Sequence, residues 1–128
     1  LAAPAPAPSD TITYVARRRH RLLGIVRLAR HSTPDVPETR HWLYSLIVKT
    51  RYRGMGIGEA LARHAISQAC KENADEVYLR VFENNQSAIA LYTKLGFKRV
   101  SRPAIEHAYH ADVQSFGCGR IVMCKHLS

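Results

Sequence analysis

The stretch RYRGMGIGEALARHA, residues 51–65, places three glycines, at 54, 56 and 58, directly before an amphipathic run. Apolar residues recur at helical spacing from Glu59 to about Asn73, which predicts a helix. The preceding run WLYSLIVK, 42–49, is apolar enough for a central strand covered on both faces. Glycines at such a strand-to-helix junction let several backbone N–H groups converge on one anion at the positive end of the helix dipole. We therefore predict an anion-binding nest here; the alternative is a tight turn that needs only the conformational freedom of glycine.

Two well-known phosphate-binding patterns do not fit these glycines. The spacing differs from G-x-G-x-x-G, and the P-loop requires G-K-[ST] where this chain has Gly58 followed by Glu59. The pattern therefore argues against a nucleoside triphosphatase.

The elements around the glycines indicate a mixed sheet. TITYVARR (11–18) and LLGIVRLAR (22–30) form a predicted hairpin, in which Gly24 marks a bulge. EVYLRVF (76–82) alternates as a strand, and a helix capped by Asn85 or Ser87 follows and ends at Gly96. Two strands, 97–101 and 119–127, close the chain around a long loop that contains histidines. A strand–helix–strand unit at the centre requires parallel strands with helices on the faces, so the predicted fold class is α/β (α+β).

Composition limits the class of protein. The 128 residues, 46% of them hydrophobic, suit one domain over 11–128 after an Ala/Pro-rich linker or tail over 1–10. Three cysteines without C-x-x-C spacing favour a reducing, cytoplasmic setting over a disulfide framework or a zinc ribbon. No apolar run approaches the roughly 18 residues of a membrane span, so we predict no membrane partner.

The net charge of +9 is concentrated in the predicted hairpin. Such a balance fits an anionic partner, which could be nucleic acid, a membrane surface or a phosphorylated small molecule. No recognition motif or stacking aromatic accompanies the arginines, so we favour a solvated hairpin tip over a nucleic-acid-binding surface. The arginines concerned are Arg17, Arg18, Arg19, Arg21, Arg27 and Arg30.

A second group of residues lies about thirty positions further on. In NNQSAIALYTKLGF (84–97), Asn85, Ala88, Tyr92 and Gly96 follow one another at steps of three, four and four. Ala88 and Tyr92 would share one helix face. A helical tyrosine taken alone is usually a half-buried packing residue.

The two blocks together resemble the GNAT superfamily of acetyl-CoA-dependent N-acetyltransferases. V-K-T-R-Y-R-G-M-G-I-G (48–58) contains that superfamily's [QR]-x-x-G-x-[GA] signature, and N-x-x-A-x-x-x-Y-x-x-x-G-F (85–97) is similar to its cofactor-side helix. The resemblance implies a mostly antiparallel twisted sheet with a central parallel strand pair, acetyl-CoA as cosubstrate, and a primary amine of a small molecule or protein as acceptor. The cofactor-binding residues that it implies are Leu46, Ile47, Val48, Arg53, Gly54, Met55, Gly56, Ile57, Gly58, Glu59, Asn85, Ala88 and Tyr92.

The resemblance also implies the chemistry. A neutral amine attacks the thioester directly, a strand N–H near Leu46 binds the oxyanion, and Tyr92 acts as general acid toward the departing thiolate. Members similar to ribosomal-protein alanine acetyltransferases carry a glutamate base twelve residues before the tyrosine, where this chain has Arg80. Arg80 either attracts an acceptor carboxylate or, as we favour, faces solvent. The substitutes for the base, acting through water, are Glu83, Tyr44, Ser45 and His41.

Two further expectations concern metals and the start of the domain. The spacing of His107, His110, Cys118 and Cys124 is irregular, so we predict no metal site. The superfamily usually begins with a strand and two helices, whereas the resemblance here covers about residues 12–127 without them. We therefore expect the acceptor groove to be open, or completed by a preceding domain or a second copy in a homodimer. The alternative function is a catalytically weak acyl-CoA-binding or regulatory module.

Overall fold

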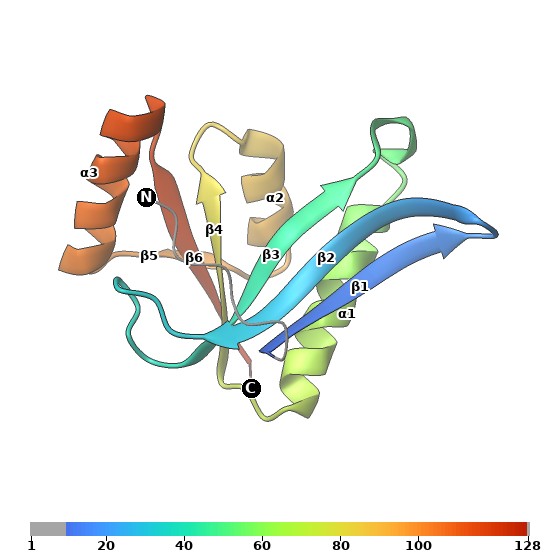
Figure 1. Cartoon of the computed structure of the whole chain (residues 1–128), viewed down its shortest axis with the longest axis horizontal. Helices are drawn as coiled ribbons and strands as arrows, with labels where there is room; N and C mark the ends of the chain where they lie inside the picture. The colour runs from blue at the N-terminus through green and yellow to red at the C-terminus, as the bar shows by residue number, and fades with distance from the viewer. Residues whose placement is uncertain (1–9, 128) are drawn as a thin grey trace.

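The computed structural model describes residues 10–127. Within them one mixed sheet carries helices on its two faces (Figure 1). The elements in chain order are β1 (Thr11–Arg18), β2 (Arg21–His31), β3 (Arg40–Val48), the 3-10 turn η2 (Thr50–Tyr52), α1 (Ile57–Lys71), β4 (Glu76–Phe82), α2 (Gln86–Lys94), β5 (Lys98–Val100), α3 (Pro103–Phe116) and β6 (Arg120–His126). The predicted linker lies outside the described residues, apart from Asp10.

The sheet confirms the predicted fold class. Its strand order is β1-β2-β3-β4-β6-β5, and among the described strands only β3 and β4 run parallel. Helix α1 provides the crossover between these two strands, as a parallel pair requires. Leu43 and Leu79 join the core under α1 and α2, whereas Trp42 and Tyr78 pack with Val36 and with Ile105 of α3 on the opposite face.

Most predicted boundaries agree with the structure within two residues. Helix α1 begins at Ile57 rather than Glu59. The cap of α2 is Asn85, whose side chain accepts a hydrogen bond from the Ala88 amide, and Gly96 follows the helix at φ 99°. The bulge expected at Gly24 is present beside it, because the register with β1 shifts between the Ala16–Gly24 and Arg17–Leu22 pairs. A Cβ at Gly24 would lie 2.7 Å from the Ile47 carbonyl oxygen, so close strand packing explains this glycine.

The predicted loop between the last two strands was wrong, because residues 103–116 form helix α3. Pro103 opens this helix and Gly117 closes it at φ 75°, a start and stop signal that was present in the sequence. Only Ile105 and Asp112 are buried, so the helix lacks the apolar stripe by which helices are recognised.

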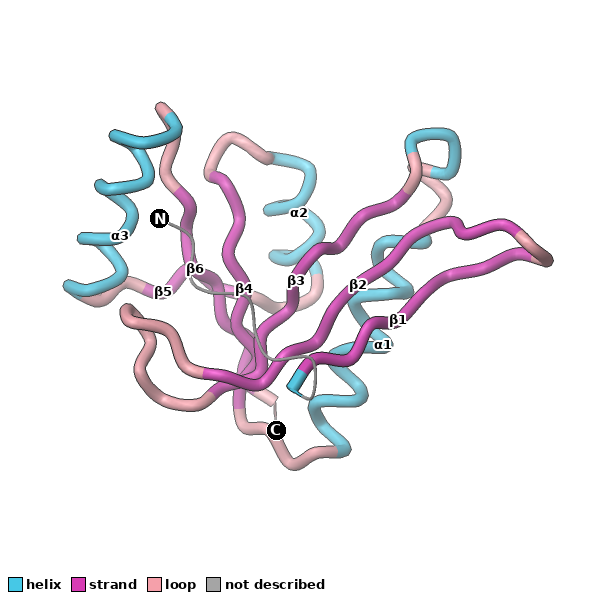
Figure 2. The backbone as a smooth tube through the Cα atoms, viewed as in Figure 1, coloured by secondary structure: helices cyan, strands magenta, loops and turns pink. Residues whose placement is uncertain are grey.

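Strand β3 leaves β4 halfway along its length, which the tube drawing of Figure 2 shows clearly. Pairing runs from His41–Val77 to Leu43–Leu79 and stops there. Directly beyond, Ser45 and Leu46 together face Val26 of β2, and Ser45 has φ 54°, so β3 contains a β-bulge. The bulge shifts the alternation by one residue: Tyr44 packs on the α3 side, whereas Leu46 packs on the α1 side.

The prediction that the strand over 42–49 is covered on both faces was only partly right. Trp42 and Leu43 are buried, but the strand becomes partly exposed from Tyr44 onward, and Ile47 is 55% exposed. Only the first half of the strand is therefore covered on both faces.

The β1–β2 hairpin extends away from the rest of the sheet (Figure 1). The arginines named above are all exposed. In the described part of the chain, no helix is both long and apolar enough to cross a membrane.

Candidate functional site

A groove of about 640 Å³ lies where β3 and β4 separate. Its walls are the end of β3, the glycine turn with the first residues of α1, and the start of α2. Because β4 does not pair with β3 beyond Leu43, an extended molecule that carries amide groups can lie along Leu46–Val48 as an added strand would. The lining residues are Leu46, Ile47, Val48, Tyr52, Arg53, Gly54, Gly56, Ile57, Gly58, Glu59, Asn85, Ser87, Ala88 and Leu91.

One end of the groove meets the N-terminus of α1. Gly54 and Gly56 adopt left-handed backbone conformations, with φ 79° and 80°, and a Cβ at either would have no atom within 4 Å. The first bond of the helix runs from the Ala60 amide to the Gly56 carbonyl oxygen. In a helix the earlier amides, here those of Ile57–Glu59, have no intrahelical acceptor. This end of the groove can therefore bind an anionic group such as a pyrophosphate.

The side chains at this helix start add positive charge. The Nε of Arg53 donates to the Val48 carbonyl oxygen at 3.2 Å, which keeps the guanidinium beside the end of β3. The Glu59 carboxylate accepts from Lys94 at 2.7 Å and from Arg63 at 3.0 Å, and these two hydrogen bonds lower its pKa. Glu59 is thus offset by two cations and does not repel an anion at the amides.

Sequence reasoning anticipated most of the lining, with two exceptions. Met55 is 62% exposed between the two glycines and does not line the groove, and the ring of Tyr92 is buried rather than in the lining. Sequence reasoning missed Tyr52, Ser87 and Leu91 as lining residues. Ser87 and Leu91 follow from the helical position of α2 beside Asn85 and Ala88, whereas Tyr52 gave no signal because η2 is too short to show a period.

Tyr92 lies one helical turn after Ala88 and is 8% exposed. Its ring packs edge-on against Phe97, with centroids 5.7 Å apart, and burial raises the pKa of its phenol. The group is therefore protonated near neutral pH, as a general acid must be before it acts.

The four predicted substitutes for the base lie in different places. The Nε2 of His41 and the Glu72 carboxylate are 2.9 Å apart at the N-terminal end of β3, away from the groove, and Ser45 is the bulge residue. Glu83 accepts a hydrogen bond from the Tyr109 hydroxyl at 2.6 Å.

Tyr44 is hydrogen-bonded to a histidine that sequence reasoning did not include. The Tyr44 hydroxyl lies 2.6 Å from Nε2 of His31, and the other ring nitrogen lies 3.0 Å from the Ser32 carbonyl oxygen. Because a carbonyl can only accept, Nδ1 of a neutral His31 carries the proton, and Tyr44 then donates to Nε2. Burial raises the pKa of Tyr44 to about 12.

The preferred interpretation of Arg80 as a solvent-facing residue was wrong. Its two terminal nitrogens each donate to an oxygen of Asp35 at 2.6 Å, and its guanidinium lies 4.9 Å from the centre of the Trp42 ring. The two side chains are 13% and 7% exposed. The fork that could have bound an acceptor carboxylate is thus occupied by Asp35, a partner 45 residues away in the sequence.

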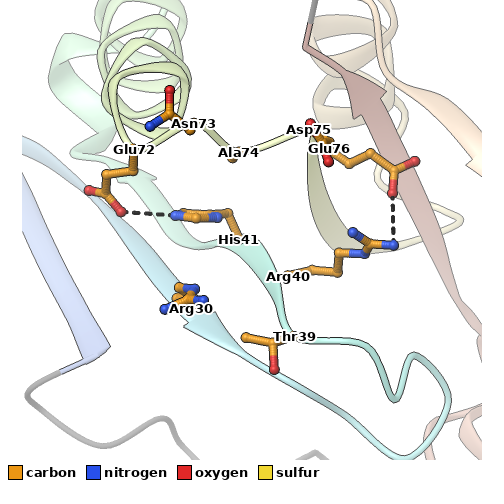
Figure 3. A pocket seen from close by; sticks show the side chains of 9 residues that line it. All are labelled: Arg30, Thr39, Arg40, His41, Glu72, Asn73, Ala74, Asp75 and Glu76. Atoms are coloured by element: carbon orange, nitrogen blue, oxygen red, sulfur yellow. Dashed lines mark hydrogen bonds and ion pairs between the residues drawn. The ribbon is translucent and has the colours of Figure 1, made fainter.

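A second pocket, of about 360 Å³, lies at the opposite end of the β3–β4 pair (Figure 3). There His41 contacts Glu72, the residue that follows α1, while Arg40 lies 3.5 Å from Glu76 of β4. These contacts hold the two strands and the end of α1 together.

The comparisons with known proteins agree with this geometry. The acetyltransferase (GNAT) family model matches residues 4–97. An N-alpha-acetyltransferase of Sulfurisphaera tokodaii is 50% identical over 70 residues, covering 53% of this chain and 40% of that protein. Human N-acetyltransferase 8B is 33% identical over 89 residues, covering 70% of this chain and 39% of that protein. This chain therefore spans about 40% of the length of these relatives.

Solved structures support the same fold. The NatC complex bound to Gag peptide and CoA contains a chain that superposes with a TM-score of 0.71 at 23% identity, covering 91% of this chain and 71% of that one. The family match spans most of the sequence and includes both the glycine turn and α2. This chain belongs to the acetyltransferase (GNAT) family.

Proposed function

We propose that this chain is an N-acetyltransferase that transfers the acetyl group of acetyl-CoA to a primary amine. The observation that carries the proposal is the groove between the diverging β3 and β4, which ends at the open amides of α1. An extended pantetheine arm suits the unpaired side of Leu46–Val48, and a pyrophosphate suits the glycine turn. The family match and the N-acetyltransferase names of the relatives support acetyl transfer.

The acceptor in this proposal is the α-amine of a peptide or protein. This choice rests on the N-alpha-acetyltransferase relative and on a similar chain in the NatC complex, which was solved with a peptide and CoA. A cytoplasmic location, which the three free cysteines favour, is part of the same proposal.

In the proposed reaction Tyr92 gives a proton to the departing thiolate of coenzyme A, because its raised pKa keeps the phenol protonated until the thiolate forms. The oxyanion of the tetrahedral intermediate accepts a hydrogen bond from a backbone N–H at the bulge near Leu46. The remaining cofactor-binding roles predicted above, those of Met55 and Asn85 included, belong to this proposal.

The Tyr44–His31 pair is the proposed route for the amine proton. An ammonium group must lose a proton before it can attack the thioester. Tyr44 can accept that proton while its own moves to Nε2 of His31, so charge never stays on the half-buried phenol. Tyr44 immediately precedes the bulge, on the same strand as the proposed oxyanion donor.

The experiment that tests this function is calorimetric titration of the chain with acetyl-CoA, followed in the same sample by thiol release with matched peptides. One peptide has a free N-terminus, a second has a blocked N-terminus and a free lysine, and a third has neither amine. Binding with release only for the first supports the proposal. Binding without release identifies an acyl-CoA-binding module, and no binding overturns the assignment of the groove.

A further inference from the structure

A group of metal-ligand side chains lies at the end of the sheet away from the acetyl-CoA groove. Glu76 opens β4, and Cys124 and His126 lie near the end of β6. In the antiparallel register Glu76 is opposite His126, and Tyr78 is opposite Cys124. Because alternate strand residues share a face, the side chains of Glu76, Cys124 and His126 extend from the same side of the sheet.

The donor atoms of this group are already close to the spacing that a metal needs. The Oε2 of Glu76 lies 3.2 Å from Nδ1 of His126 and 3.5 Å from Sγ of Cys124. One donor atom from each of the three residues lies within 4.8 Å of the other two. With Zn–ligand bonds of about 2.0–2.3 Å, a tetrahedral ion places its ligands roughly 3.3–3.7 Å apart. Both distances to Glu76 therefore match the edges of a zinc tetrahedron within a few tenths of an ångström.

The second oxygen of Glu76 is held separately. Its Oε1 lies 3.5 Å from a guanidinium nitrogen of Arg40 and accepts a hydrogen bond from the Tyr78 hydroxyl at 3.4 Å. Figure 3 shows Arg40 reaching this carboxylate. Ligating carboxylates in metal sites are commonly oriented in this way by groups around the site. Arg40 and Tyr78 thus direct Oε2 toward the thiol and the imidazole.

We propose that Glu76, Cys124 and His126 form a zinc site that links β4 to β6. Imidazole nitrogen, thiolate sulfur and carboxylate oxygen are all ligand types that zinc accepts, and the two distances to Glu76 fit tetrahedral spacing. Binding breaks the S–H bond of Cys124, forms a Zn–S bond and releases the proton to solvent, and water fills the fourth position. The side chain of His126 is 81% exposed, so the ion can enter from that side, whereas Cys124 is buried.

The predicted role of this ion is structural. The acetyl-CoA groove lies beyond the other end of β4, near Asn85, so the ion takes no part in acetyl transfer. It instead links the first residue of β4 to the last residue of β6. The ion should therefore raise the melting temperature of the chain and leave its affinity for acetyl-CoA unchanged.

The test is metal binding by the full chain, with Co²⁺ as the spectroscopic probe and Zn²⁺ as its competitor. We expect one Co²⁺ per chain with a sulfur-to-metal charge-transfer band, which Zn²⁺ removes. Cys124→Ser should abolish the band, and His126→Ala should weaken Zn²⁺ binding by at least about tenfold. Cys70→Ser and His110→Ala are matched controls, since each removes an exposed side chain of the same kind elsewhere, and neither should change binding.

Absence of the band in the unmodified chain would overturn the proposal. So would a band that persists in Cys124→Ser or disappears in Cys70→Ser. If Cys124→Ser fails to fold, His126→Ala decides alone, because its exposed ring contributes little to packing. Unchanged zinc affinity and unchanged stabilisation by zinc in that variant would contradict the site.

Discussion

The two ends of the β3–β4 strand pair differ sharply. At one end the strands are paired, Arg40 of β3 lies 3.5 Å from Glu76 of β4, and His41 of β3 lies 2.9 Å from Glu72, which follows α1. At the other end the strands separate, Ser45 adopts φ 54°, and glycines replace side chains. The linked end builds stability, while the separated end leaves backbone groups free for a ligand.

The physical reason for the difference is one extra residue. The bulge at Ser45–Leu46 turns β3 away after Leu43, and backbone groups that would have paired with β4 then face the groove. The strands can diverge because the paired half holds them together. Substitutions in either half therefore test this explanation.

Of the substitutions considered, Asp35→Asn should cause the largest loss of folding stability, and it acts at the paired end of the strands. It removes the partner of the buried Arg80 guanidinium, and breaking such a pair costs about 3 kcal/mol. Denaturant unfolding at neutral pH measures this loss.

The pH dependence checks the cause. Burial favours the neutral form of Asp35, but the hydrogen bonds from Arg80 and Thr33 outweigh it, so the pKa of Asp35 lies below its ordinary value. A lowered folded pKa stabilises the protein above the unfolded pKa of about 3.9, and that stability is lost as the pH falls through the folded pKa. The difference between unmodified chain and variant should therefore shrink in acid. A constant difference would contradict the ion pair.

Tyr92→Phe should affect only the acetyl-transfer reaction at the separated end of the strand pair. We expect kcat to fall about 100-fold if the phenol protonates the thiolate, with unchanged affinity for acetyl-CoA. Steady-state kinetics with the acceptor peptide measure it. Tyr14→Phe on β1 is the control. Equal kcat in both variants would indicate that Tyr92 serves only in packing.

Gly56→Val should weaken binding of acetyl-CoA about 30-fold, the loss of roughly one charge-assisted hydrogen bond of 2 kcal/mol. The branched side chain disfavours φ 80° and covers the amides at the start of α1. Calorimetry measures the affinity.

Gly117→Val is the matched control for this change. Gly117 has φ 75° and equally open surroundings, but it follows α3. Both variants should lose similar stability, and only Gly56→Val should lose affinity. Equal affinity for acetyl-CoA in the two variants would contradict the anion-binding role of the glycine turn.

Glu72→Ala should have the smallest effect, about 1 kcal/mol of stability. It leaves the buried Nε2 of His41 without its acceptor, and the partial exposure of Glu72 weakens the interaction. Glu72→Gln keeps an acceptor and is the control. Urea unfolding should separate the two variants, while their affinity for acetyl-CoA stays unchanged because the groove is at the other end.

Much of the fold could be predicted because its signals are local. The period of the strands, the helix after the glycines and the Asn85 cap all follow from residues within one or two turns of each other. Helix α3 was missed because it buries only Ile105 and Asp112, so its apolar period is weak despite the Pro103 start. Most of the groove lining was predictable because it lies within the glycine motif and the motif of α2. The Tyr44–His31 pair was not, because it depends on the register between β2 and β3.

Local sequence patterns were enough to specify the strands, the first two helices and an open turn of glycines, since dihedral preferences and capping act between near neighbours. Tertiary structure alone decided where β3 leaves β4, why Arg80 is held by Asp35, and which side chains surround Glu76. Each of these depends on strand register, in which a shift of one residue moves a side chain to the other face of the sheet. Contacts between residues 45 or more positions apart, such as Asp35 with Arg80 and Glu76 with Cys124, leave no pattern in a single sequence.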